Sequence, residues 1–430
     1  MSRHSSRPTF PTPFLWAALG LTIVAAIYFA MPAILPTIYN AQEKVAAQTA
    51  ATEPVKPVVA HIKTPSSVRG IYMTQCVVGT PSFRKELVDF IEAADLNALV
   101  IDIKDYSGTI SFKTDDPLFT DVSVTNCGTS DMHGFIEALH DKGIYVIGRI
   151  TVFQDPHYSN IHPEQAVQSA SRGGPWKDNK GLSFVDVSSK PFWDYIVALA
   201  KISYTDFGFD ELNFDYIRYP SDGPMADAVY QNPHKAEALE IFFHYLHDQL
   251  KPLGVVLSAD LFGYVTVHTD DLGIGQVLET ALPYFDYIDP MVYPSHYNSG
   301  FAGLKNVNSD PYKVVYVSLL KAVERSLATT TTVAALSETP VFRTEIIPAT
   351  GTTPTTTREV ATGSYTKTSF PAEKIRPWLQ SFDYPVPYTP AMVEAQIKAT
   401  TDAGLTSWLF WDAGNKYTAL REVLSLETYE

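Results

Sequence analysis

Acidic side chains recur at the ends of short apolar segments of this chain. The clearest case is 209–220, FDELNFDYIRYP, where strand-forming residues are interspersed with Asp210 and Asp215. A parallel strand buried on both faces normally carries Val, Ile and Leu, so acids at its carboxyl end are typical of a barrel active site. The alternative is that these acids cap a loop or pair with Arg218, and the sequence leaves that alternative open.

Glycoside hydrolysis is the chemistry that such acids could perform. One carboxylic acid protonates the leaving oxygen, and a second carboxylate acts as the nucleophile or as the base for water. The acid needs a pKa raised by burial or by a like charge, while the second group must stay ionised. We predict Asp215 as the nucleophile or base. For the acid we predict Asp289 first and Asp260 second, because we expect the fourth and sixth strand ends to face each other across the mouth.

Side chains that could hold a sugar follow the same strand ends. Charged and amide groups could bind hydroxyls or tune the catalytic pair, and aromatic rings could stack on sugar rings. The predicted substrate-binding residues are Asp102, Lys104, Asp105, Arg149, Asn213, Arg218, Tyr293, His296, Trp378, Gln380, Trp408, Trp411 and Asp412.

Other chemistries find little support in the sequence. It contains no phosphate-binding loop, no GxSxG and no HExxH, and Gly273-Ile274-Gly275 lacks the rest of a dinucleotide fingerprint. We therefore predict no metal and no cofactor. The two cysteines, Cys76 and Cys127, form no zinc-binding pattern. They could form a disulfide if the domain is exported, although sequence alone cannot establish the geometry.

Strands and helices alternate along most of the chain, which predicts an α/β fold, a (β/α)8 TIM barrel, over 68–430. A doubly wound open sheet is the alternative, but it gives no reason for acids at so many strand ends. A Thr-rich segment, 328–370, interrupts the pattern as a flexible or β-ribbon insertion and is more readily surface decoration than a lid. The predicted strands are 68–78, 98–104, 144–152, 209–220, 255–261, 287–293, 375–382 and 406–411.

The first 67 residues differ in composition from the rest. A basic tail, 1–13, precedes an apolar stretch, 14–35, which as a helix is about 33 Å long, enough to cross a bilayer. We predict an uncleaved single-pass anchor over a cleaved signal peptide, with the tail cytoplasmic and the barrel extracytoplasmic. Residues 36–67 read as a flexible linker. The net charge of −15 makes nucleic acid a poor partner.

Several long motifs of the chain resemble one bacterial family. They are RGIYMTQCVVG, NALVIDIKDYSGTISF, FDELNFDYIRYPSDG, YIDPMVYPSHY and KIRPWLQSFDY. They resemble the putative glycoside hydrolase domain family, TIM barrels first described as a domain of unknown function. The resemblance runs from Val68 to the C-terminus, outside the Thr-rich insertion, and implies a glycosidase.

A more distant similarity is to the family 18 chitinases. Asp210, Asn213 and Asp215 match the first three acidic positions of the chitinase strand, and Ile217 stands where the catalytic Glu would be. In MVYPSHY, Pro294 replaces an Asp. The comparison implies that a chitinase-type, substrate-assisted mechanism is not available here.

Together these observations predict a membrane-anchored glycosidase that cleaves a cell-surface or environmental polysaccharide with paired carboxylates. A non-catalytic glycan-binding barrel of the cell envelope is the alternative, and the two differ in whether reducing ends are released.

Overall fold

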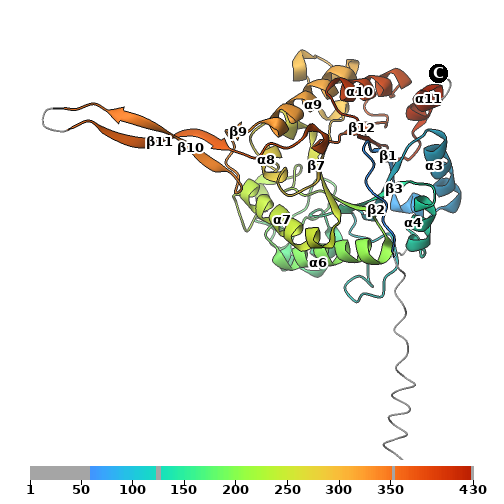
Figure 1. Ribbon diagram of the computed structural model, residues 1–430. Coiled ribbons are helices and arrows are strands. Elements are labelled where there is room, and N and C mark those ends of the chain that lie inside the picture. The colour runs from blue at the N-terminus through green and yellow to red at the C-terminus, as the bar shows by residue number, and fades with distance from the viewer. Residues whose placement is uncertain (1–58, 123–126, 351–353, 428–430) are drawn as a thin grey trace, which may run out of the picture. The chain divides into compact units, whose positions relative to one another are not determined.

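Eight parallel strands close into a barrel in the order in which they occur along the chain (Figure 1). The last strand pairs with the first, Arg69 lying opposite Trp408, so the sheet has no open edge. The predicted (β/α)8 TIM barrel is confirmed. The strands are β1 (Arg69–Met73), β2 (Ala98–Lys104), β3 (Tyr145–Thr151), β5 (Glu211–Asp215), β7 (Val256–Phe262), β8 (Tyr287–Met291), β12 (Trp378–Gln380) and β13 (Trp408–Trp411).

This computed structural model describes residues 59–122, 127–350 and 354–427. The predicted tail, the anchor at 14–35 and most of the linker lie outside these ranges. Within them, none of the helices has the length and apolar character needed to cross a membrane.

Helices cover the outer face of the barrel because each carries one apolar stripe. In α6, Phe192, Ile196 and Leu199 recur at helical spacing and are fully buried. The helices are α2 (Gln75–Val78), α3 (Pro81–Ala93), α4 (Met132–His140), α5 (Pro156–Ile161), α6 (Lys190–Ile202), α7 (Lys235–Leu250), α8 (Leu278–Ala281), α9 (Pro311–Leu327), α10 (Pro390–Asp402) and α11 (Thr418–Glu427).

Two predicted strands end earlier than expected. The segment predicted as 68–78 stops at Met73, because the Thr74 hydroxyl accepts a hydrogen bond from the Val77 N–H (3.2 Å) and starts α2. The segment predicted as 209–220 stops at Asp215, because Tyr216 has a left-handed backbone with φ of 52°. Both strands therefore end where the chain reaches the barrel mouth.

Polar side chains of β5 face the inside of the barrel. Leu212 and Phe214 of β5 pack in the main apolar core, while the alternating residues Glu211, Asn213 and Asp215 face inward. Glu211 is fully buried and pairs with the Arg376 guanidinium (2.5 Å). Buried charges of this kind are tolerated only when paired.

The Thr-rich insertion forms an antiparallel ribbon between α9 and β12. It consists of β9 (Thr330–Thr331), β10 (Thr339–Ile347) and β11 (Thr356–Thr366). The long strands β10 and β11 extend away from the barrel (Figure 1). A two-residue pair, β4 (Gln168–Ser169) with β6 (Ala228–Val229), joins two loops elsewhere.

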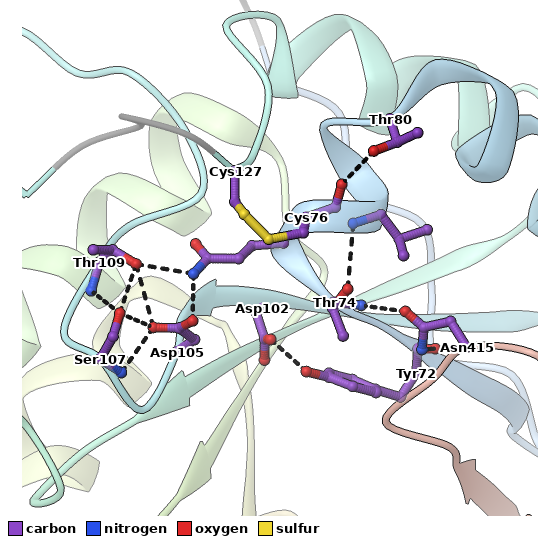
Figure 2. Close-up of a disulfide and its surroundings, with 12 residues drawn as sticks. Tyr72, Thr74, Cys76, Thr80, Asp102, Asp105, Ser107, Thr109, Cys127 and Asn415 are labelled. Carbon is purple, nitrogen blue, oxygen red and sulfur yellow. Dashed lines mark hydrogen bonds between the residues drawn. A yellow bond between two sulfur atoms is a disulfide. The ribbon is translucent and has the colours of Figure 1, made fainter. Parts of the chain in front are cut away.

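A disulfide joins Cys76 to Cys127, which are 51 residues apart in sequence (Figure 2). Cys76 lies in α2, directly after β1, and Cys127 lies in the long loop between β2 and α4. The Gly128 N–H also donates to the Gln75 carbonyl oxygen (2.8 Å). The bond therefore fastens the loop that follows the second strand to the end of the first.

Candidate active site

A pocket of about 390 Å³ opens at the carboxyl ends of the barrel strands. This is the end at which TIM-barrel enzymes place their active sites. Its wall combines two carboxylates, two arginines and many aromatic rings. The lining residues are Arg149, Asp215, Tyr216, Arg218, Asp260, Phe262, Gly263, Tyr264, Met291, Tyr293, His296, Tyr297, Phe382 and Trp411.

The Asp215 carboxylate is held by Arg149. Its Oδ2 accepts from Nη2 (2.5 Å) and Nε (3.1 Å) of the guanidinium, and its Oδ1 accepts from the Tyr216 backbone N–H (2.6 Å). Arg149 comes from β3, whose Thr151 lies in register with Asp215 at the end of β5. The two N–H groups of one guanidinium therefore fix the position of Asp215 Oδ2.

Asp102 holds Arg149 from the other side. Its Oδ1 accepts from Arg149 Nη1 (2.6 Å), and its Oδ2 accepts from the Tyr72 hydroxyl (2.5 Å), as Figure 2 shows for the tyrosine. Burial raises the pKa of Asp102 to about 6, against the lowering effects of Arg149 and of the Tyr72 hydrogen bond. Because Asp102 does not line the pocket, it positions Arg149 and has no direct path to a ligand.

Asp260 is the second carboxyl group in the pocket. Its Oδ1 accepts from Trp378 Nε1 (2.7 Å) and from the Asn213 amide (2.8 Å). Burial raises the pKa of Asp260 well above its usual range, and the charges of Asp215 and Asp289 raise it further. With two donors on Oδ1, the proton of the neutral form belongs on Oδ2.

The two pocket carboxyls share one guanidinium nitrogen. Arg149 Nε lies 3.1 Å from Asp215 Oδ2 and 3.9 Å from Asp260 Oδ2. The two oxygens can therefore be no farther apart than the sum of those distances. This upper bound falls within the range of carboxyl separations, roughly 5 to 9.5 Å, found in glycosidases.

The structure corrects the predicted position of Asp289. Both oxygens of this carboxylate accept from Arg376, at 3.0 and 2.7 Å, and the side chain is fully buried below the pocket. The barrel order places only β7 between β5 and β8, so their ends do not face each other across the mouth. Asp260, the second choice for the acid, lies in register with Asp289 on β7 and does line the pocket.

The turn after β5 is strained in a way that shapes the pocket. Tyr216 has φ of 52°, a conformation that bulky residues rarely adopt and that clusters at functional sites. It directs the chain so that both Tyr216 and Arg218 line the pocket. Nearby, a Cβ on Gly263 would lie 2.5 Å from the Met291 carbonyl oxygen, so only glycine allows this close approach.

Aromatic rings form a second wall. Trp411 stacks on Tyr72, with ring centroids 3.9 Å apart, and the Arg149 guanidinium lies 5.0 Å from the Trp411 ring centroid. Tyr293 and His296 follow β8 and contact Phe382, with centroids 5.5 and 5.9 Å away. Sugar rings stack on such surfaces through their apolar faces.

Two predicted binding residues of the second strand lie elsewhere. Lys104 is fully buried and donates to Asp155 (2.8 Å) and to the Thr151 carbonyl oxygen (2.7 Å). The register of β2 against β3 shifts between Asp102 and Lys104, which changes the face on which the lysine lies. Asp105 accepts from the Gln75 amide and from Ser107 in a tight turn (Figure 2).

Three others support the site without lining the main pocket. Trp408 packs in the outer apolar core, because it is three residues before the inward Trp411 and strand faces alternate. The Gln380 side-chain amide donates to the carbonyl oxygens of Phe382 and Tyr384, both at 3.1 Å. Asp412 accepts from the backbone N–H groups of 414, 416 and 417 and lines a neighbouring pocket.

Trp378 and Asn213 have positioning roles. Trp378 is fully buried behind the pocket, where it donates to Asp260 and packs edge-on against Trp411. The Asn213 amide also donates to Ser258 (3.1 Å) and Asp289 (3.2 Å). Sequence reasoning missed Tyr72 as a partner of the site. Because alternate side chains of a strand face the inside of the barrel, the alternation along β1 could have indicated that Tyr72 faces inward.

Metal binding finds no ready-made donor set in the parts of the chain that the structure describes. No group of three or more His, Cys, Asp or Glu side chains there is arranged to hold an ion.

Comparison with known proteins identifies a family. Residues 70–336 and 348–417 match the model of a family described as "Putative glycosyl hydrolase domain". A search of curated proteins gives no match.

Solved structures add relatives and fold neighbours. A hypothetical protein from Ruminiclostridium thermocellum is 33% identical, covering 47% of this chain and 98% of its own, with a TM-score of 0.40. The glycoside hydrolase domain of PgaB (BpsB) from Bordetella bronchiseptica is 13% identical, covering 84% of this chain and 99% of its own, with a TM-score of 0.51. Alpha-L-fucosidase isoenzyme 2 from Paenibacillus thiaminolyticus is 10% identical over 84% of this chain and 49% of its own, also with a TM-score of 0.51. The last two share the fold.

Proposed function

Because this chain belongs to the family described as "Putative glycosyl hydrolase domain", we propose that it cleaves a cell-surface or environmental polysaccharide with Asp260 and Asp215. The observation that carries the proposal is the pair of carboxyls in one pocket, joined through Arg149 but in opposite environments. Asp215 accepts two hydrogen bonds from the Arg149 guanidinium, whereas burial raises the pKa of Asp260 and so favours its neutral form. Environments that separate two carboxyls in this way assign the base and the acid.

Asp260 acts as the general acid in this proposal. Its Oδ2 proton passes to the glycosidic oxygen as the bond from that oxygen to the anomeric carbon breaks, and the leaving sugar departs as an alcohol. Trp378 and Asn213 hold Oδ1, which fixes the direction of the proton on Oδ2. Positive charge develops on the sugar ring, and the anionic Asp215 stabilises it.

Asp215 completes the reaction by one of two routes. It attacks the anomeric carbon to give a glycosyl ester that water then hydrolyses, or it removes a proton from water that attacks directly. The upper bound on the separation of the two carboxyls accommodates both routes. Trp411, Tyr293 and Phe382 supply ring surfaces on which the polysaccharide stacks.

The proposed location is the outer face of the cell membrane, with 14–35 as the anchor. The Cys76–Cys127 disulfide supports an oxidising compartment for the barrel, since such bonds seldom persist in the cytosol. Protection of the barrel from added protease in intact cells would contradict this location.

The test is release of reducing ends from a panel of polysaccharides by the full-length protein. Asp215→Asn and Asp260→Asn should each lower kcat by about 10²-fold or more, because each removes one member of the pair. Asp115→Asn is the matched control, since this aspartate is exposed and outside the pocket lining. A glycan that binds but is never cleaved would replace the hydrolase by the glycan-binding alternative.

A further inference from the structure

Arg218 is a buried cation of the pocket without an acidic partner. Its side chain is 7% exposed, and Nη1 donates to the Tyr219 carbonyl oxygen (3.1 Å). In the described part of the chain, no carboxylate lies within ion-pairing distance of its guanidinium. Arg218 lines the pocket, so its side chain is within reach of a ligand bound there.

The other two arginines of the barrel interior are each neutralised twice. Arg149 binds Asp102 and Asp215, and Arg376 binds Glu211 and Asp289. A buried charge without a counter-ion is strongly destabilising, so an unpaired arginine at a pocket wall needs a reason. Stability alone would favour an apolar residue at 218.

Aromatic rings hold the plane of the Arg218 guanidinium. Its central carbon lies 4.8 Å from the ring centroids of both Tyr216 and Phe262, and 5.8 Å from that of Phe184. Tyr216 and Phe262 line the same pocket. The guanidinium is therefore fixed in orientation before a ligand arrives, which reduces the entropy lost on binding.

We propose that Arg218 is an anion subsite and that the substrate carries a carboxylate on the sugar ring bound beside Asp215 and Asp260. This inference rests on the proposed glycosidase function and specifies its substrate class. A planar guanidinium can present two parallel N–H groups to a ligand, and these match a planar carboxylate. Asp215, Asp222 and Asp178 act on the Arg218 charge only from beyond ion-pairing distance, so one further negative charge can pair with it directly. A phosphate dianion would place extra charge next to the Asp215 carboxylate.

The first experiment compares a uronate-containing oligosaccharide with the same oligosaccharide after reduction of its carboxyl groups to alcohols. For the wild type, kcat/KM should favour the acidic form by roughly ten- to a hundredfold, the size expected of a charge-assisted hydrogen-bonded pair. In Arg218→Gln this ratio should fall to near 1. In Arg218→Lys it should fall to an intermediate value, because lysine keeps the positive charge but lacks the two parallel N–H donors of a guanidinium. Arg343→Gln, an exposed change on β10, should leave the ratio unchanged. An unchanged ratio in folded Arg218→Gln would overturn the proposal.

The second experiment needs neither turnover nor a variant. Calorimetric titration of the wild type with a hexuronate and with its methyl ester should show at least tenfold weaker binding of the ester. A sugar that carries its carboxylate on a lactate ether tests the second way in which a sugar ring can bear a carboxylate. Selective binding of the uronate or of the lactate ether supports the subsite and shows which kind of carboxylate it accepts. Selective acid binding without cleavage of any glycan would contradict the hydrolase and keep the subsite. Equal binding of the acid and the ester, or preference for a sulfated sugar, would refute the proposed carboxylate subsite.

Discussion

Substitution of Asp260 by Asn should lower kcat by about 10²-fold or more and at the same time make the protein more stable at neutral pH. The two side chains are nearly the same size, and the amide oxygen of Asn can still accept from Trp378 and Asn213. What disappears is an acidic proton buried among like charges. A catalytic acid kept neutral by its surroundings weakens the fold, and removal of such a group commonly stabilises an enzyme.

The size of the effect follows from proton linkage. The pKa of Asp260 is raised in the folded chain by burial and then by Asp215 and Asp289. The folded state therefore binds this proton more tightly than the unfolded state, and stability falls as the pH rises from the unfolded value toward the folded one. Each pH unit in that window is worth about 1.4 kcal/mol, which gives at most about 4 kcal/mol between an unfolded pKa near 3.9 and pH 7.

Urea denaturation of the full-length wild type and variant at pH 4, 5, 6 and 7 measures this difference. The free energies of unfolding of the two proteins should be nearly equal at pH 4. With each step to higher pH, the variant should become more stable relative to the wild type. Asp115→Asn is the control, since this aspartate is exposed and outside the pocket lining, and its stability difference from the wild type should stay near zero at every pH.

A particular pattern would refute this reasoning. If Asp260→Asn destabilises the protein by a similar amount at every pH, Asp260 is ionised in the folded state and cannot be the acid. The same conclusion would follow if the variant retained its activity.

Three further results are expected. Arg149→Met should lower kcat/KM by about 10²-fold or more, and stability by about 3–5 kcal/mol in urea, because it leaves two buried carboxylates unpaired; full activity would exclude this arginine from the site. The value of kcat/KM should fall at alkaline pH as Asp260 ionises. In Trp378→Phe this fall should occur at higher pH, because the variant lacks the Nε1 hydrogen bond that favours the Asp260 carboxylate. A shift of the fall to lower pH would contradict the assignment of Asp260 as the acid. Replacing Cys76 and Cys127 together by Ser should lower stability by about 4 kcal/mol, as expected for a loop of this length, and an unchanged urea midpoint would show that the bond adds nothing.

The sequence carried enough information for the barrel. Apolar strands alternate with amphipathic helices, and this local periodicity predicted all the strand positions of the closed sheet. Boundaries were less accurate where a side chain or an unusual φ ended the strand, as at Thr74 and Tyr216. Such endings depend on one hydrogen bond or one torsion, which periodicity does not record.

The sequence also determined that acids gather at the strand ends, and it singled out Asp215 and Arg149. Only the tertiary structure decided which acid shares the pocket with Asp215. Asp260 and Asp289 lie in strands that the sequence predicts equally well. However, Arg376, just before β12, donates to both oxygens of Asp289. Lys104 and Asp155 likewise satisfy each other across 51 residues. Which buried charges are paired, and which one is left open to a ligand as at Arg218, depends on contacts between distant strands, and local sequence patterns cannot specify those contacts.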